Sequence, residues 1–426
     1  MKENVLRKMR EALYHRFDDI SGPSEFFALQ KSIAEDIIKC EKYIAQNDED
    51  NNLWKEHLQK LLSLGDSIAW LVLDPFTIRQ LGKYDSVRTS LANQEDVIVD
   101  ILNKYQGISY KSIYLIADIT RCITVGDIIE VITCDRVKII ECKSSKPEII
   151  TADNILQGRN GRQFSKAFWL QAYMKTGFGK LYGNDLPSKV IEIETSSKSY
   201  IELIPNLIDE CIKNKNGFAF VQVEPGLIYM AQKNGFELNE EIVESLPKLK
   251  KPVIASTARL IEEPKETIFH APPLVLNIPF EYRIMLQEVD VNIIGILDLN
   301  YIQEVCTQMK YQYSETQKGE PQLSKDGKCY IFHIRFINDI LINFIPVKNA
   351  IETMVLLFEN IEDLDGQLTL EEKKQMERRP LNRKEFVKYL EDNYVLVAQN
   401  EDGKMLKAYT MRGEIIFDTH WTHHRT

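Results

Sequence analysis

Two short runs of β-branched residues, separated by only three residues, constrain the fold of this chain more than any other feature. The first run, residues 128–133, follows Gly126-Asp127, and the second, residues 137–140, ends in Glu141-Cys142-Lys143. The link over residues 134–136 is short enough for a hairpin turn. We therefore expect two antiparallel strands with polar residues gathered at the open end of the hairpin.

The pairing register decides which polar residues meet. If Thr133 pairs with Val137, antiparallel counting puts Asp127 beside Lys143; if Thr133 pairs with Arg136, it puts Asp127 beside Cys142. Alternate residues of a strand share a face, so Glu141 and Lys143 point to one side and Cys142 to the other. Either register brings one Asp, one Glu and one Lys together.

This set of residue types is typical of a metal site. The carboxylates of Asp127 and Glu141 repel each other at close range unless a cation lies between them. Hard oxygen ligands favour Mg²⁺ or Mn²⁺. The alternative is a surface hairpin with an ion pair across its strands, which is a common arrangement.

The pattern Gly126-Asp127 with Glu141-Cys142-Lys143, in the order α-β-β-β-α-β, resembles the PD-(D/E)xK nuclease superfamily, also called restriction-endonuclease-like. The resemblance covers about residues 92–225. Many members have Pro where this chain has Gly126. The resemblance implies hydrolysis of phosphodiesters with one or two divalent metal ions.

Carried over by position, Asp127 and Glu141 would hold the metal ion, and the backbone carbonyl of Cys142 would add a third oxygen ligand. Lys143 would orient the attacking water or help to deprotonate it. A lysine suits this role because it is a compact point charge that can donate to both water and phosphate.

The helix expected over residues 158–175 adds candidate substrate contacts. At about 100° per residue, one stripe of it gathers basic and aromatic residues, which suits phosphate contact and base stacking, although a solvated helix face explains it equally well. The stripe consists of Arg159, Arg162, Lys166, Trp169 and Tyr173. Superfamily members often direct a Gln or a basic residue from this helix toward the metal, and Gln163 is our candidate, followed by Arg162.

Some superfamily members add a Glu from the first core helix. Glu95 is the candidate here, or else Asp96. The competing interpretation is an ordinary acidic residue at a helix N-terminus, where the helix dipole favours negative charge.

At 426 residues the chain is too long for one ordinary core, so we expect several domains. Helical periodicity over 1–90 predicts a helical region, with a break near Pro75. Residues 91–225 form the expected α/β core, restriction-endonuclease-like with αβββαβ order, and residues 226–426 an α+β region of unknown role. Within that last region, 340–347 is expected as a strand and 394–411 as a hairpin.

Composition narrows the class of protein. The net charge is −10, yet the stretch 143–182 holds seven basic and two acidic residues, a local positive surface. No run approaches the ~18 apolar residues of a membrane span, and the first residues lack a signal-peptide core. The seven scattered cysteines are expected to be reduced, and we expect a cytoplasmic protein without membrane contact.

Other groups of residues in the sequence give weaker evidence for a metal or catalytic site. The stretch 361–372 imitates a calcium-binding loop, but its first ligand position is Ile361. Asp418, His420, His423 and His424 could bind a transition metal, although a frayed terminus is the simpler explanation. The other four histidines are isolated in the sequence, and no P-loop pattern is present.

The leading hypothesis is therefore a Mg²⁺- or Mn²⁺-dependent nuclease, with DNA favoured over RNA, in a defence or restriction setting, and with a homo-oligomer or a regulatory protein partner. The alternative is a nuclease-like protein that has lost catalysis and binds nucleic acid or a protein partner. A third hypothesis is a structural or regulatory protein with a fortuitous motif, which the negative net charge mildly favours.

Overall fold

The computed structural model describes part of the chain. The described residues are 2–46, 51–84, 90–95, 98–99, 101–102, 113–134, 136–143, 166–167, 170–171, 173–174, 177–179, 188–190, 198–238, 240–263, 265–362, 394–399, 405–410 and 415–421. The side chains of 141–143, 178–179, 188–189, 361–362 and the last three ranges lie outside this description. The protein is mixed α/β, as expected, and divides into two compact units, residues 1–190 with 368–426 and residues 191–367.

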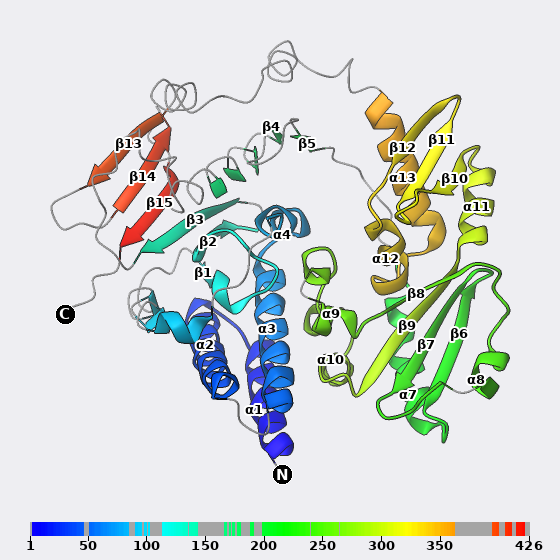
Figure 1. Ribbon diagram of the computed structural model, residues 1–426, viewed down its shortest axis with the longest axis horizontal. Helices are drawn as coiled ribbons and strands as arrows, with labels where there is room; N and C mark the ends of the chain where they lie inside the picture. The colour runs from blue at the N-terminus through cyan, green and yellow to red at the C-terminus, as the bar shows by residue number, and fades with distance from the viewer. Residues whose placement is uncertain are drawn as a thin grey trace. The chain divides into compact units, whose positions relative to one another are not determined.

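Unit 1 combines N-terminal helices with a six-stranded sheet of order β1-β2-β3-β15-β14-β13 (Figure 1). Its helices are α1 (Lys2–Asp18), α2 (Pro23–Ala45), α3 (Asn51–Val72) and α4 (Pro75–Leu81), with 3₁₀ turns η1 (Leu91–Gln94) and η2 (Ala117–Ile119). Its strands are β1 (Ile113–Ile116), β2 (Ile128–Thr133), β3 (Arg136–Lys143), β13 (Tyr394–Gln399), β14 (Met405–Thr410) and β15 (Ile415–Trp421), with a separate short pair β4 (Phe178–Gly179) and β5 (Ser188–Lys189).

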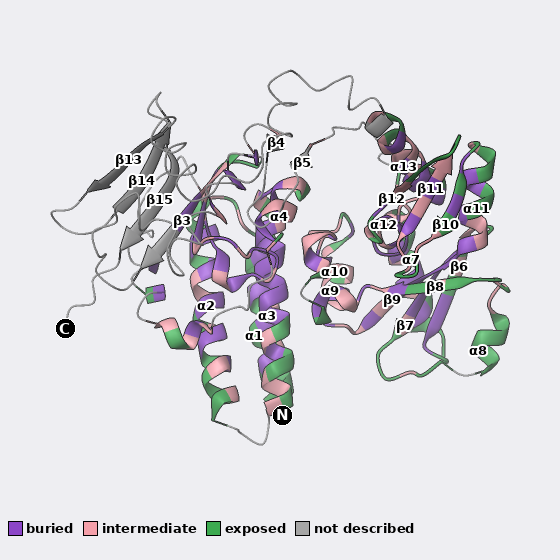
Figure 2. Ribbon diagram, turned by 45° about the horizontal axis from the view of Figure 1, so that its top comes forward, coloured by how far each residue is buried: buried purple, intermediate pink, exposed green. Residues whose placement is uncertain are grey.

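The break expected near Pro75 separates two helices. Helix α3 ends before Pro75, and the carboxylate of Asp74 caps α4 by accepting from the backbone N–H groups of Phe76 and Thr77. The second half of α3 is largely buried (Figure 2). Because so many of its residues face protein, α3 is a central support of unit 1.

The sheet of unit 1 joins distant parts of the chain. β2 and β3 form the expected antiparallel hairpin, β1 pairs antiparallel with β2, and β13 and β14 form the expected C-terminal hairpin. The parallel neighbour of β3 is β15, with Thr419 opposite Glu141. The C-terminal segment therefore belongs to the unit that carries the motif, a division that differs from the expected boundary at 225/226.

Unit 2 is built on a four-stranded antiparallel sheet of order β6-β7-β9-β8. Its strands are β6 (Phe218–Glu224), β7 (Leu227–Lys233), β8 (Pro252–Ser256) and β9 (Val291–Asp298), and a second sheet contains β10 (Gln312–Glu315), β11 (Pro321–Lys325) and β12 (Lys328–Ile331). The expected boundary at 225/226 falls between β6 and β7, which pair with each other along their lengths.

The helices of unit 2 pack on both faces of this sheet, one of them through Ile242 against the face opposite the main core. They are α7 (Ile204–Lys213), α8 (Glu240–Ser245), α9 (Arg259–Glu262), α10 (Phe280–Gln287), α11 (Leu299–Gln308), α12 (Arg335–Ile342) and α13 (Val347–Glu362), with 3₁₀ turns η3 (Ile201–Leu203), η4 (Glu266–Ile268) and η5 (Pro273–Val275). The strand expected at 340–347 is wrong, because residues 340–342 complete α12. A short apolar run fits a buried helix turn as well as a strand.

Candidate functional site

The hairpin of β2 and β3 adopts neither of the two expected registers along its whole length. Thr133 does pair with Arg136, but the register shifts between Val131 and Thr133, so that Ile128 lies opposite Ile140. Beyond that pair, the backbone N–H of Asp127 donates to the carbonyl of Ile140 at 2.9 Å. Asp127 therefore lies beside the Ile140–Glu141 peptide rather than beside Cys142 or Lys143.

A β-bulge is the physical reason for this difference. One extra residue, Ile132, enters β2 without a counterpart on β3, and its side chain is exposed. A bulge moves every later pair by one position, which residue counting from the turn cannot foresee.

Gly126 lets the chain approach β3 closely just before Asp127. Its φ of +82° is in the left-handed region, where a side chain is strained. A Cβ atom at this position would also lie 2.6 Å from Cγ2 of Ile139. Both facts explain why glycine precedes Asp127 here. Many members of the PD-(D/E)xK superfamily, which the motif resembles, have proline at this position.

The backbone of Asp127 is held from both sides, because its carbonyl accepts from the N–H of Ala117 at 2.9 Å. The neighbouring side chains on both faces of the hairpin are buried, namely those of Ile128, Ile129, Ile139 and Ile140. Well-packed strands position a polar side chain at their end more rigidly than a loop does.

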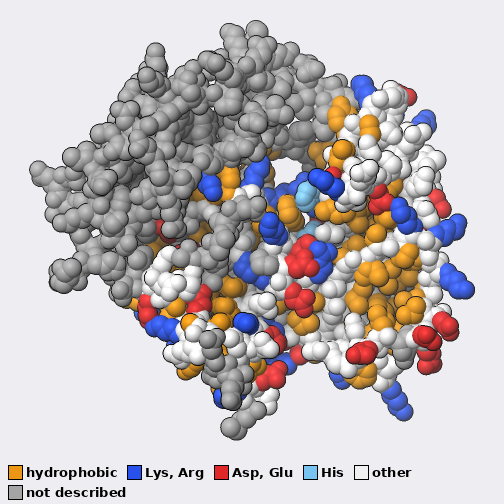
Figure 3. Space-filling view, in the orientation of Figure 1, with side chains coloured by type: hydrophobic (Ala, Val, Ile, Leu, Met, Phe, Trp, Pro, Cys, Tyr) orange, Lys and Arg blue, Asp and Glu red, His pale blue; other side chains and the backbone are white. Residues whose placement is uncertain are grey.

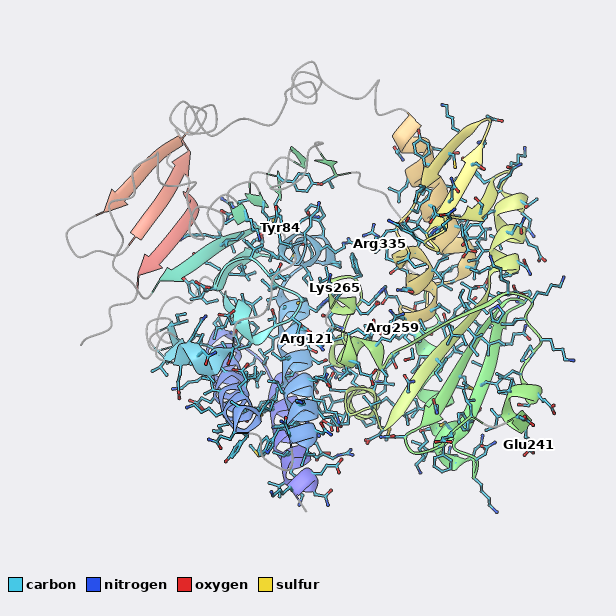
Figure 4. The ribbon with its side chains drawn as sticks, viewed as in Figure 1. Tyr84, Arg121, Glu241, Arg259, Lys265 and Arg335 are labelled. Carbon is cyan, nitrogen blue, oxygen red and sulfur yellow. The ribbon has the colours of Figure 1, made fainter. Side chains whose placement is uncertain are left out.

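Two buried polar contacts anchor the same region to the helices. Gln30 of α2 accepts from the N–H of Ile116 and donates to the carbonyl of Tyr114, both at 2.8 Å, and so completes the outer edge of β1. Asp66 of α3 accepts from the backbone N–H groups of Arg121 and Cys122 and from the Arg121 guanidinium at 2.7 Å (Figure 4). Asp66 and Arg121 are almost fully buried, so this pair ties α3 to the segment that leads into the hairpin.

The four motif residues lie at the open end of the hairpin. Asp127 is half-buried, and Glu141, Cys142 and Lys143 are the last residues of β3, with side chains outside the description. Among the side chains that are described, no group of three His, Cys, Asp or Glu residues is arranged to hold a metal ion.

The helix that follows the motif is described at six positions between 166 and 174. Lys166 lies over the ring of Tyr84, with Nζ 5.1 Å from the ring centroid. Tyr173, expected on the exposed stripe, is instead buried near Phe76, with ring centroids 6.3 Å apart, and this burial raises its pKa. Tyr173 therefore does not belong to the exposed stripe of basic and aromatic side chains that its helical angle suggested. Arg159, Arg162, Gln163 and Trp169 lie outside the described residues.

Glu95 is engaged away from the hairpin. Its carboxylate forms an exposed ion pair with Lys42 of α2, with Nζ and Oε2 2.5 Å apart. Next to it, Glu41 of α2 accepts from the N–H of Ala92 in η1. These contacts hold the start of the expected first core helix against α2. Asp96, the other candidate, lies outside the described residues.

In unit 2 the structure gathers a polar cluster that the sequence analysis missed. His270 is fully buried, with Nδ1 3.1 Å from Nδ2 of Asn343 and 3.5 Å from Oδ1 of Asp339, and with Nε2 3.5 Å from Oε2 of Glu266. Only the i, i+4 spacing of Glu266 and His270 was visible in the sequence, because Asp339 and Asn343 come from α12 and the residue after it.

Burial, and then the positive charge of Arg259, lowers the pKa of His270 to about 3. The imidazole is therefore neutral near pH 7 and a very weak base. A neutral, solvent-inaccessible histidine between helices is an internal polar contact, so this cluster ranks below the hairpin as a site of chemistry.

No family model, no curated protein and no solved structure matches this chain. None of the described helices combines the length and the apolar character that a bilayer span requires.

Proposed function

We propose that this protein is a metal-dependent nuclease that hydrolyses phosphodiester bonds of nucleic acid, with DNA favoured over RNA. The observation that carries the proposal is the hydrogen bond from the N–H of Asp127 to the carbonyl of Ile140, which brings the aspartate next to Glu141. The resemblance to PD-(D/E)xK nucleases motivates the reaction class, and a defence or restriction setting follows from that resemblance alone.

The donor set suits a hard divalent cation. Asp127, Glu141 and the backbone carbonyl of Cys142 would hold Mg²⁺ or Mn²⁺ through oxygen. When bound, such an ion lowers the pKa of its water ligand and offsets the charge that develops on the phosphoryl group. Lys143, two residues after Glu141 on the same strand, would hold the attacking water and donate to the phosphate. The buried strands behind Asp127 keep it in place.

The decisive experiment is cleavage of double- and single-stranded DNA and of RNA with Mg²⁺ or Mn²⁺. We expect Asp127→Asn, Glu141→Gln and Lys143→Met each to lower the rate by on the order of 1,000-fold, because a missing catalytic group is not replaced by its neighbours. Circular dichroism should show that the variants remain folded.

Glu130→Gln is the matched control. Glu130 is a carboxylate on the same hairpin but forms an ion pair with Lys138 at 3.4 Å, away from the open end. The Glu130→Gln variant should cleave at the rate of the wild type. Nucleic-acid binding without cleavage in the wild type would replace this proposal with the binding-protein alternative, and a fully active Asp127→Asn protein would refute the assignment of the site.

A further inference from the structure

Helix α4 of unit 1 is fixed at both of its ends to the region of the β2–β3 hairpin. At its start, the backbone N–H of Asp74 donates to the carbonyl of Cys134, in the hairpin turn, at 3.1 Å. At its end, the carbonyl of Leu81 accepts from the backbone N–H and the hydroxyl of Thr124, at 2.9 and 3.0 Å. The helix therefore leads from the hairpin turn to the segment that precedes Asp127.

The C-terminal end of α4 is the end nearer to Asp127. Thr124 precedes Asp127 by three residues, which limits the separation of their Cα atoms to about 11 Å. The hairpin turn is seven residues from Asp127 along a strand, or roughly 23 Å at ~3.3 Å per residue. The two residues that follow this end of α4 after Gly82, Lys83 and Tyr84, therefore lie toward the proposed metal site (Figure 4).

The helix that follows the motif lies antiparallel to α4. Its later residue Tyr173 packs against Phe76 in the first turn of α4, with ring centroids 6.3 Å apart. Its earlier residue Lys166 lies beyond the other end of α4, with Nζ 5.1 Å from the ring centroid of Tyr84. Lys166 and Lys83 therefore come from different elements but lie at the same end of α4.

These two lysines lack a counter-ion. Within the part of the chain that the structure describes, the ammonium groups of Lys83 and Lys166 form no ion pair or hydrogen bond. Desolvation by the surrounding protein lowers the pKa of Lys83. By contrast, Lys39 and Lys138 of the same unit are paired with carboxylates, at 2.9 and 3.4 Å. Figure 3 shows several basic side chains around the position of α4. An anion supplied from outside would complete this surface.

We infer that Lys83 and Lys166 bind phosphates of the nucleic acid that enters the proposed metal site, and that the ring of Tyr84 holds Lys166 in position. The inference rests on the proposed function, because the nearness of this end of α4 to Asp127 is what gives the lysines a substrate. Two cations on separate elements suit a polyanion with one phosphate per ~3.4 Å of axis on each strand better than one small anion. Such contacts position the substrate without reading its sequence.

The test is the binding of a short DNA duplex to the full chain in EDTA, followed by fluorescence anisotropy at several salt concentrations, so that no cleavage is needed. We expect Lys83→Ala and Lys166→Ala each to weaken binding by about fivefold and to reduce the slope of log affinity against log salt by about 0.9, the value for one phosphate contact. Lys39→Ala is the matched control. It changes the net charge equally, but Lys39 is paired with Asp36 on α2, so affinity and slope should stay unchanged.

Tyr84 is tested as a positioning residue. Tyr84→Phe keeps the aromatic face and should bind DNA like the wild type, whereas Tyr84→Leu removes it and should weaken binding by about two- to threefold. In the Lys166→Ala background the leucine substitution should have no further effect, because no cation remains for the ring to hold. Melting curves check that each variant is folded. An equal effect of Tyr84→Leu in both backgrounds would overturn the role given to the ring.

Binding and cleavage together separate this inference from the proposed function. A wild type that cleaves DNA but binds it equally well after both lysine substitutions would overturn the inference and leave the nuclease proposal intact. Binding that depends on both lysines, without cleavage in Mg²⁺ or Mn²⁺, would support the phosphate contacts and refute the nuclease. A wild type that does not bind DNA, or that polyglutamate of equal charge displaces from DNA as well as unlabelled duplex does, would overturn the choice of nucleic acid as the ligand.

Discussion

The β1–β3 meander of unit 1 and the β6–β9 sheet of unit 2 are stabilised differently. Around the meander, buried polar groups make specific contacts, notably Asp66 with Arg121 and Gln30 with the edge of β1. In unit 2 the sheet interior is apolar, and Glu224 makes its polar contacts at the turn after β6, where it accepts from the hydroxyls of Tyr200 and Tyr301.

This difference in stabilising contacts affects how each sheet should respond to a single substitution. Hydrogen bonds and buried ion pairs fix direction and register, so they suit a region that must position Asp127. Apolar burial is non-directional, so the packing of the β6–β9 sheet depends less on any single contact. The two units should therefore respond differently to the loss of single contacts.

The largest effect on stability is expected from Asp66→Ala. It leaves the Arg121 guanidinium buried without its carboxylate and removes the acceptor of two backbone N–H groups, which should lower the free energy of unfolding of unit 1 by about 3–5 kcal/mol. Urea unfolding followed separately for the two units should show the shift in unit 1 alone.

An exposed ion pair in unit 2 provides the contrast for Asp66→Ala. Removal of Glu352, which lies 3.7 Å from Lys348 on the surface of α13, should cost less than about 0.5 kcal/mol. An equal loss in the two variants would contradict the idea that unit 1 depends on its buried polar contacts.

Two glycines with the same backbone angle sharpen the comparison. Gly126 in unit 1 and Gly235 in unit 2 both have φ of +82°, but a Cβ atom would collide with Ile139 only at Gly126, and would meet nothing within 4 Å at Gly235. Alanine at Gly235 should cost roughly 1–2 kcal/mol of backbone strain. Alanine at Gly126 should cost roughly 1–3 kcal/mol more.

The proposed nuclease activity would add a second measurement to the glycine pair. Because Gly126 precedes Asp127, its substitution should lower the cleavage rate as well as stability, whereas the Gly235 variant should cleave normally. Similar melting temperatures for the two variants would show that Ile139 moves aside without cost.

The smallest expected effect is a dependence of the stability of unit 2 on pH, caused by two tyrosines that contact Glu224. Burial, and then the charge of Glu224, raises the pKa values of Tyr200 and Tyr301 to about 12, whereas an unfolded tyrosine titrates near ~10. Between these values the unfolded chain loses protons that the folded unit keeps, so the stability of unit 2 should fall as the pH rises from about 10 to about 12.

Tyr301→Phe tests this effect. It should cost about 1 kcal/mol at neutral pH through the lost hydrogen bond and should reduce the alkaline slope of unit 2. Thermal unfolding measured at several pH values would reveal both changes. An unaltered slope in the variant would mean that other groups cause the alkaline loss.

Local patterns in the sequence were sufficient for the elements that interact with their immediate neighbours. Two runs of β-branched residues predict β2 and β3, and Pro75 marks the end of α3. Similar reasoning failed at Tyr173, whose helical angle suggested exposure, because Phe76 from α4 packs against it. The bulge at Ile132 could not be predicted from the sequence either. The pairing registers on its two sides each give a plausible hairpin.

The linear pattern was enough to place Gly126-Asp127 and Glu141-Cys142-Lys143 at the end of one hairpin, because β-branched runs and a short link act over a few residues. Packing in three dimensions placed β15 beside β3, brought Asp66 to Arg121, and put Ile242 of α8 on the face of the β6–β9 sheet opposite the main core. The physical reason is that these contacts join segments far apart in the chain. Their partners are selected by packing, charge and hydrogen-bond geometry in three dimensions, which a one-dimensional pattern does not contain.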